Sequence, residues 1–228
     1  SIKAYDKGIP MIVNGKEMPI HVRYKNNKHT YFRIQEDGLH IHTSHGMPED
    51  LIKNHIIQNF DIFYERYIQF NRLGRRFTLW GKSLKVHYKM GEPSYVIHEQ
   101  TIDIVHHTYD EGIKYVLKNE LEKYINSIHK DICKHLEVFD ISQLNYEFKY
   151  YKSKFGAYHK VHDKIYLNTF LATLDQAYTW YVLMHEYAHT KHFHHQKSFY
   201  NLLQSLHPDY KYIEKSLKSL VIPSVFHV

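Results

Sequence analysis

His185, Glu186 and His189 form an H-E-x-x-H motif. If the segment is helical, residues four apart lie on one face, so both imidazoles can bind the same metal ion. Glu186 can then point toward a metal-bound water without itself binding the metal. Because zinc lowers the pKa of such a water to about 7, a neighbouring carboxylate can take its proton. The motif therefore indicates zinc-dependent hydrolysis with Glu186 as general base.

A catalytic zinc site uses three protein ligands and leaves one position open. His195 follows His189 by six residues, which is the ligand spacing of the metzincin pattern H-E-x-x-H-x-x-G-x-x-H. Two features differ from a metzincin, because His192 occupies the place of the turn glycine and no methionine follows Met184. We predict His185, His189 and His195 as the metal ligands.

Histidine is abundant, with 21 in 228 residues, so accidental motifs must be considered. At this frequency about 0.1 chance matches to H-E-x-x-H are expected, and about 0.01 once the third histidine is required. Glu214, on a later helix, is the main alternative third ligand, and His192 and His194 are further alternatives.

Composition narrows the class of protein. The chain is 43% hydrophobic and 24% charged, which is close to globular proteins and excludes overall disorder. Its single cysteine, Cys133, excludes an intramolecular disulfide. No apolar run approaches the ~18 residues of a membrane span, so we expect a cytoplasmic protein with no membrane partner. The net charge of +6 is spread along the chain and predicts at most weak contact with nucleic acid.

The elements that must position the motif predict an α+β fold. Asn14-Gly15 and Asp37-Gly38 are hairpin signals within a strand-rich N-terminal region, residues 1–108. A helix from Met47 interrupts these strands. The remaining region, 109–228, is dominated by helices and carries the motif near the C-terminus. Expected there are helices at 110–138, 174–191, 197–206 and 210–220 and strands at 144–151 and 164–168. No internal repeat is predicted.

His40 and His42 alternate on one predicted strand and could together chelate a metal. We interpret them as part of a solvated strand face.

A longer run resembles a known family. His185 to His192, His195, Ser198-Phe199-Tyr200 and Pro208-Asp209-Tyr210-Lys211 are similar to the YgjP-like metallopeptidases, small intracellular zincins related to the SprT-like and WLM groups. Upstream, Ile165-Tyr166-Leu167-Asn168 and Lys154-Phe155-Gly156 match the family less closely. Phe155, Ala157 and Tyr158 replace the family's usual Trp, Ser and Cys. The resemblance implies a zincin-like fold, zinc bound by His185, His189 and His195, and Glu186 as general base.

The sequence thus predicts a zinc metallopeptidase acting on a peptide or protein. Two alternatives stay open: a metal-dependent phosphohydrolase acting on nucleotides or nucleic acid, and a non-catalytic zinc-binding interaction module. An oxyanion would need a second donor, for which Tyr200, His192, His207 and Tyr210 are candidates. The strand at 164–168 could pair with an extended substrate.

Overall fold

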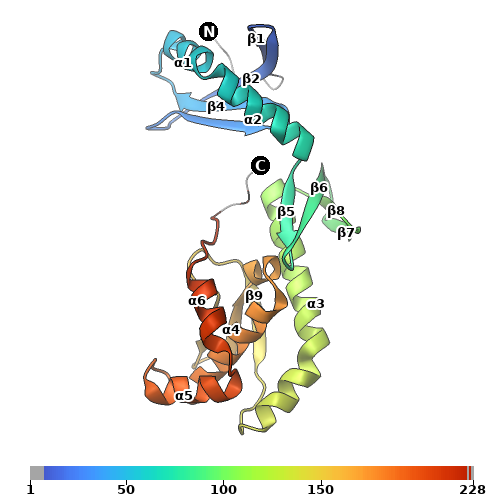
Figure 1. The fold of residues 1–228 in the computed structure, drawn as a ribbon, viewed down its shortest axis with the longest axis vertical. Coiled ribbons are helices and arrows are strands. Elements are labelled where there is room, and N and C mark those ends of the chain that lie inside the picture. Colours follow the sequence, from blue (N-terminus) through green and yellow to red (C-terminus); the bar gives the residue numbers. More distant parts are fainter. Residues whose placement is uncertain (1–7, 225, 227–228) are drawn as a thin grey trace. The chain divides into compact units, whose positions relative to one another are not determined.

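The computed structural model describes residues 8–224 and 226, and the chain divides into two compact units between Arg76 and Phe77 (Figure 1). Both units mix helices and strands, which confirms the α+β class. The boundary differs from the expected change of region after residue 108. The reason is packing, because Leu84 and Ile102, on strands that follow Phe77, share one core with Ile113 of the next helix.

The first unit is built on a four-stranded sheet of order β1-β2-β4-β3. Strands β2 and β4 pair in parallel, and the two outer pairs are antiparallel. Asn14 and Gly15 have φ of 50° and 76°, which is the left-handed pair that a tight hairpin requires. The strands are β1 (Ile9–Val13), β2 (Lys16–Lys25), β3 (Tyr31–Gln35) and β4 (Gly38–Ser44).

Two helices, α1 (Glu49–Gln58) and α2 (Phe60–Leu73), cover one face of this sheet. The sequence predicts one helix here, but Asn59 leaves helical geometry with φ of −109°. Its side-chain amide donates to the carbonyl of His55 at 2.9 Å, so the amide competes with the backbone for the helical acceptor. Ile52, Ile56, Phe60 and Phe63 pack on Met18, Ile20, Val22, Leu39 and Ile41 to form the core of the unit.

The second unit begins with a sheet of the same topology, of order β5-β6-β8-β7. Here too the middle strands are parallel, and Val86 pairs with Ile102 as Ile20 pairs with Leu39. Both sheets precede a helix, so the two units share a topology although the sequence shows no repeat. Different loop lengths and few shared residues hide the repeat in the sequence. The strands are β5 (Arg76–Leu79), β6 (Lys82–Met90), β7 (Ser94–Ile97) and β8 (Thr101–His106).

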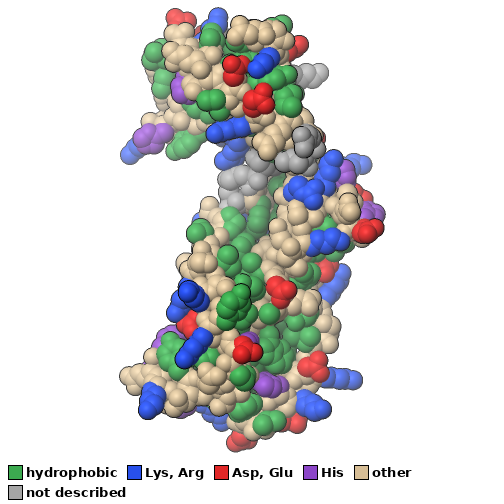
Figure 2. Space-filling model, viewed as in Figure 1, with side chains coloured by type: hydrophobic (Ala, Val, Ile, Leu, Met, Phe, Trp, Pro, Cys, Tyr) green, Lys and Arg blue, Asp and Glu red, His purple; other side chains and the backbone are tan. Residues whose placement is uncertain are grey.

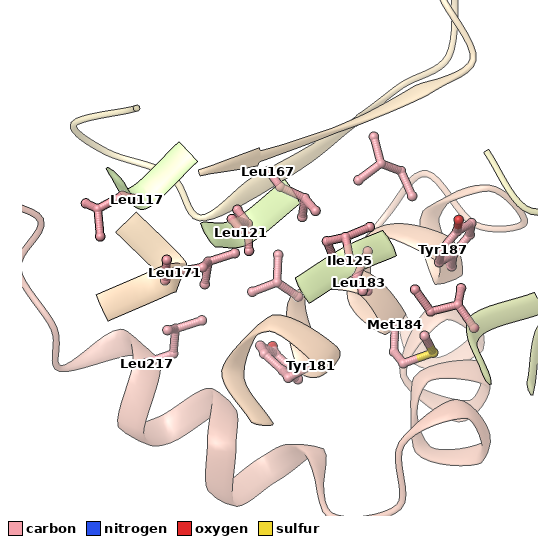
Figure 3. Close-up of a cluster of buried hydrophobic side chains, with 14 of the residues drawn as sticks. Leu117, Leu121, Ile125, Leu167, Leu171, Tyr181, Leu183, Met184, Tyr187 and Leu217 are labelled. Atoms are coloured by element: carbon pink, nitrogen blue, oxygen red, sulfur yellow. The ribbon is translucent and has the colours of Figure 1, made fainter. Parts of the chain in front are cut away.

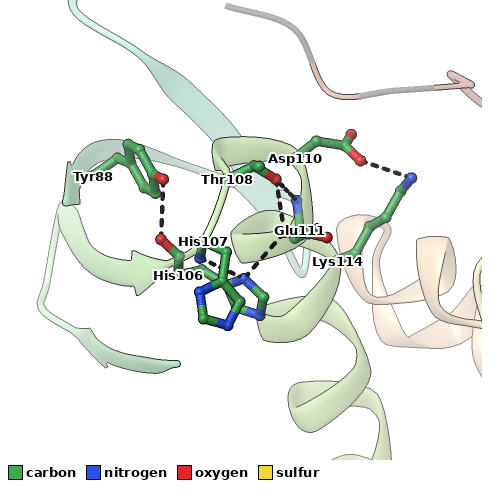
Figure 4. A network of polar contacts seen from close by, with 7 residues as sticks. All are labelled: Tyr88, His106, His107, Thr108, Asp110, Glu111 and Lys114. Carbon is green, nitrogen blue, oxygen red and sulfur yellow. Dashed lines mark hydrogen bonds and ion pairs between the residues drawn. The ribbon is translucent and has the colours of Figure 1, made fainter. Parts of the chain in front are cut away.

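The long helix α3 (Tyr109–Glu137) begins after the N-cap residue Thr108. The Thr108 hydroxyl accepts from the Glu111 amide at 3.2 Å and donates to the Glu111 carboxylate at 3.1 Å (Figure 4). This pair satisfies an amide that the first helical turn leaves without a partner. In the same region the Tyr88 hydroxyl donates to the His106 carbonyl at 3.0 Å, which ties β6 to β8 where the helix starts.

A second, three-stranded sheet lies between α3 and the C-terminal helices. Its order is β10-β11-β9, with β9 parallel and β10 antiparallel to β11. The expected substrate pairing at 164–168 is therefore wrong, because that segment is β11 and both of its edges are occupied. The free edge beside α4 belongs to β10, a strand that the sequence did not predict. The strands are β9 (Asn145–Lys149), β10 (Gly156–His159) and β11 (Lys164–Asn168).

The 3-10 helix η1 (Thr169–Thr173) leads into α4 (Gln176–His189), which is followed by α5 (Lys197–Leu206) and α6 (Tyr210–Lys218). Asp175 caps α4 by accepting from the Ala177 amide at 2.9 Å. Figure 3 shows the shared core, where α3 meets β11, η1, α4 and α6 through Leu121, Leu167, Leu171, Leu183 and Leu217.

Among the helices that the structure describes, none combines the length and apolar character needed to cross a membrane. On the face drawn in Figure 2, basic and acidic side chains are interspersed over the second unit.

Candidate metal centre

Helix α4 presents His185 and His189 on one face, one turn apart. The helix is largely buried, since Tyr181, Val182, Leu183, Met184, Tyr187 and Ala188 all lie in the core. A helix fixed on several sides by packing holds its remaining side chains in defined directions. The rings of His185 and His189 lie with their centroids 5.0 Å apart.

The chain turns after α4 and brings His195 back to the same place. The amides of Lys191 and His192 both bond to the Ala188 carbonyl, at 3.2 and 3.1 Å, which ends the helix. His195 Nε2 then lies 3.3 Å from His185 Nε2. His192 is not one of the described residues with positive φ. The turn therefore needs no glycine at the position where metzincins have one.

His185, His189 and His195 each offer a ring nitrogen, and these nitrogens lie within 4.8 Å of one another. Three neutral imidazoles that converge in this way match the ligand number and type of a catalytic zinc site. The residues therefore fit the metal that the sequence predicts.

Among the described residues, the alternative ligands are not part of this group of converging donors. The Glu214 carboxylate pairs with the Lys218 ammonium at 2.6 Å. His194 Nδ1 accepts from the Gln196 amide at 3.3 Å. His192 contributes its backbone carbonyl, 3.0 Å from His189 Nδ1.

Two contacts orient the imidazoles. A bond from His189 Nδ1–H to the His192 carbonyl leaves the Nε2 lone pair of His189 free for a metal. The Tyr181 hydroxyl lies 3.3 Å from His185 Nδ1. Phe199, which is fully buried, lies with its ring centroid 5.0, 4.5 and 5.0 Å from those of His185, His189 and His195. One aromatic ring thus supports all three candidate ligands.

Burial sets the charge of these groups. The pKa of His185 falls to about 3, because burial disfavours the imidazolium and His189 and His195 add repulsion. Burial raises the pKa of Glu186 to about 7, although the Tyr158 amide, 2.6 Å from Glu186 Oε2, opposes the rise. Burial therefore makes Glu186 a stronger base than an exposed carboxylate.

Sequence reasoning missed the role of β10. Tyr158 on this strand supplies the amide that holds Glu186. Gly156 permits the approach, because a Cβ there would lie 2.7 Å from Val182 Cγ1 and 3.4 Å from Glu186 Cγ. The Lys154-Phe155-Gly156 segment was the available signal, but its departures from the family pattern obscured it.

Two cavities meet at His185, Glu186 and Gly156. The larger, of about 360 Å³, is also lined by Ala157, Tyr158, His189, Phe193 and His195. The smaller, of about 220 Å³, is mostly apolar and also lined by Phe155, Tyr181, Val182, Glu214, Leu217 and Lys218. Tyr158 and Tyr181, rather than the four residues that the sequence suggested as oxyanion donors, line these cavities.

The chain is similar to known metallopeptidases. A family model described as "YgjP-like, metallopeptidase domain" matches residues 28–220. No curated protein matches. One similar solved structure is the metallopeptidase zymogen jannalysin of Methanocaldococcus jannaschii, at 23% identity and a TM-score of 0.34. That match covers 39% of this chain and 92% of the jannalysin chain.

Proposed function

Because this chain belongs to the YgjP-like metallopeptidase family and is a metallohydrolase, we propose that it cleaves peptide bonds with one zinc ion. His185, His189 and His195 would hold the ion, and Glu186 would act as general base. The observation that carries the proposal is the buried Glu186 carboxyl beside three convergent imidazoles.

A zinc ion in this position supplies Lewis acidity, which polarises a carbonyl and lowers the pKa of water to about 7. Glu186 takes a proton from the attacking water and delivers it to the departing amine nitrogen. Burial raises the pKa of Glu186, which opposes the lowering that a bound zinc ion would cause and helps the carboxyl to accept and then release the proton. The Tyr158 amide donates to Glu186 Oε2, which leaves Oε1 to accept the proton.

The substrate would lie along β10. This strand has a free edge in the sheet order, and its residues Gly156 to Tyr158 line the larger cavity. An extended peptide can add to such an edge through main-chain hydrogen bonds. The apolar cavity between Tyr181 and Leu217 would take an apolar substrate side chain next to the cleaved bond.

Replacing Glu186 by Gln tests the mechanism. Glu186→Gln should retain zinc, measured by elemental analysis, and lose roughly 10²- to 10⁴-fold in turnover of an unfolded protein substrate. The matched control is Glu214→Gln, which alters a carboxylate of the neighbouring cavity and should retain both zinc and most activity. Full activity of Glu186→Gln would refute the assigned base, and loss of zinc in Glu214→Gln would favour the alternative ligand.

A parallel assay separates peptide from phosphate chemistry. The same purified protein is given unfolded protein in one arm and nucleoside triphosphates in the other. Cleavage of triphosphates without cleavage of peptide would overturn the proposal. Purified protein that holds no zinc and gains no activity when zinc is added would refute any catalytic role.

A further inference from the structure

A second group of possible metal ligands lies in the first unit, on the sheet face opposite α1 and α2. His21 of β2 and His40 of β4 are neighbours in the parallel register. Asp37 occupies the turn between β3 and β4. The donor atoms of the three side chains lie within 4.8 Å of one another.

The two imidazoles are held in place by the sheet. Their ring planes are stacked, with centroids 4.1 Å apart and only 7° between the planes. The side chains of His21 and His40 are 7% and 12% exposed. Folding already orders these two side chains, so binding a ligand to them costs little further conformational entropy.

Asp37 lies beside the Nε2 atoms of both imidazoles. Its Oδ1 lies 2.6 Å from His40 Nε2, and its Oδ2 lies 3.5 Å from His21 Nε2. Gly38, with φ of +125°, packs so tightly on the Pro19 carbonyl that no Cβ fits, and this contact holds the turn against β2. His21 Nε2 also donates to the Asp37 backbone carbonyl, at 3.0 Å. Both imidazoles therefore direct Nε2 toward Asp37.

We propose that His21, Asp37 and His40 form a second metal site, distinct from the three-histidine centre, that binds a divalent first-row transition ion. Two imidazoles and one carboxylate suit zinc, cobalt or nickel better than calcium or magnesium, which prefer oxygen ligands. Asp37 is 60% exposed, so water can complete the coordination. Binding requires each neutral imidazole to move its proton from Nε2 to Nδ1, with no net proton released.

Charge predicts the relative strength of the two sites. The positive charge of Arg23 acts on His40. Arg23 also repels a cation. We therefore expect this site to fill after the three-histidine centre.

The topological repeat supplies an internal control. In the sheet of β5 to β8, His87 pairs in register with Asp103, as His21 pairs with His40 in the first unit. His98 contacts Asp103 at 2.8 Å, but these two side chains are 50% and 51% exposed. Among the described residues, His87, His98 and Asp103 do not form a group of converging donors. The sheet of β5 to β8 thus carries the same residue types but no group of converging metal ligands among the described residues.

Zinc stoichiometry of the full chain tests the proposal. Equilibrium dialysis should give two zinc ions per wild-type chain and one in the double variant His185→Ala/His189→Ala. Adding either His40→Ala or Asp37→Asn to the double variant should abolish that remaining ion. Adding His98→Ala should leave it bound. Circular dichroism verifies that each variant is folded.

The site can also be located without variants in the first unit. Cobalt added to the double variant should shift the side-chain proton resonances of His21 and His40 in NMR spectra. The proposal is overturned if the double variant binds no zinc. It is also overturned if its zinc survives both His40→Ala and Asp37→Asn, or if cobalt shifts other histidines and not these two.

Discussion

Gly156→Ala tests whether the contact between β10 and α4 sets the basicity of Glu186. An added Cβ would lie 2.7 Å from Val182 Cγ1 and 3.2 Å from the Tyr166 carbonyl oxygen. Restoring an ordinary 3.4 Å contact to Val182 moves β10 by about 0.7 Å. A shift of that size along the Tyr158–Glu186 hydrogen bond lengthens it from 2.6 Å to about 3.3 Å, where it is weak.

The expected loss follows from the energy of that bond. A hydrogen bond to a charged group contributes about 1.5–3 kcal/mol, which corresponds to about one to two pKa units at 1.36 kcal/mol per unit. The Tyr158 amide lowers the pKa of Glu186, so weakening it raises that pKa further. The carboxylate is the active form, and activity is therefore lost as the pH falls through the pKa. The acid limb of kcat/KM should move to higher pH by about one to two units, so activity at a pH on that limb should fall roughly 10- to 100-fold.

The assay is a pH profile of kcat/KM for zinc-loaded Gly156→Ala beside wild type. Bound zinc lowers the pKa of Glu186 in both proteins, so the difference between the two profiles is the quantity to compare. Gly46→Ala is the control, because a Cβ there meets no atom within 4 Å. Adding Val182→Ala to Gly156→Ala removes the clashing methyl and should recover part of the lost activity. An unchanged acid limb in Gly156→Ala would refute the reasoning.

Three further changes follow from the packing around the site. Tyr187→Phe leaves the Leu144 amide and the Tyr146 hydroxyl without their shared partner. It should lower the free energy of unfolding, measured in urea, by about 1–3 kcal/mol. Tyr212→Phe, at a 77% exposed position, is the control and should leave that free energy unchanged. Phe199→Ala should lower the free energy of unfolding by about 3–5 kcal/mol. It should also weaken zinc binding in a competition titration, because it removes the ring that contacts all three candidate ligands. Unchanged zinc affinity would contradict this role of Phe199. Removing metal with a chelator should lower the unfolding temperature, since an ion at 1,000 times its Kd stabilises the native state by about 4 kcal/mol, and identical melting with and without chelator would argue against a bound ion.

The sequence predicted the helices around the site well, because local signals act there together. Helix α4 lies within the predicted range 174–191, and the spacing from His185 to His195 selects the three histidines that the structure brings together. The strand at Lys164–Asn168 also has the predicted bounds.

The missed features depend on contacts between distant segments. Strand β10 is four residues long and carries little alternation of its own. It is fixed by pairing with β11 and by the close approach of Gly156 to α4. His21 and His40 lie far apart in the chain and meet only through the parallel register of β2 and β4. Local spacing singled out His40 with His42 instead, and periodicity alone could reveal neither long-range pairing.

Helix α3 has a consequence for how the second unit unfolds. Its 29 residues pack on β8 near one end and on η1 and β9 further along. Neither sheet can therefore separate from the helix without exposing apolar surface that also supports the other sheet. The two sheets and α4 consequently form one cooperative folding unit. Replacing Ile104 of β8 by a smaller residue would leave a cavity in a sheet that holds none of the three histidines. It would nevertheless lower the free energy of the unfolding that disrupts the three-histidine centre.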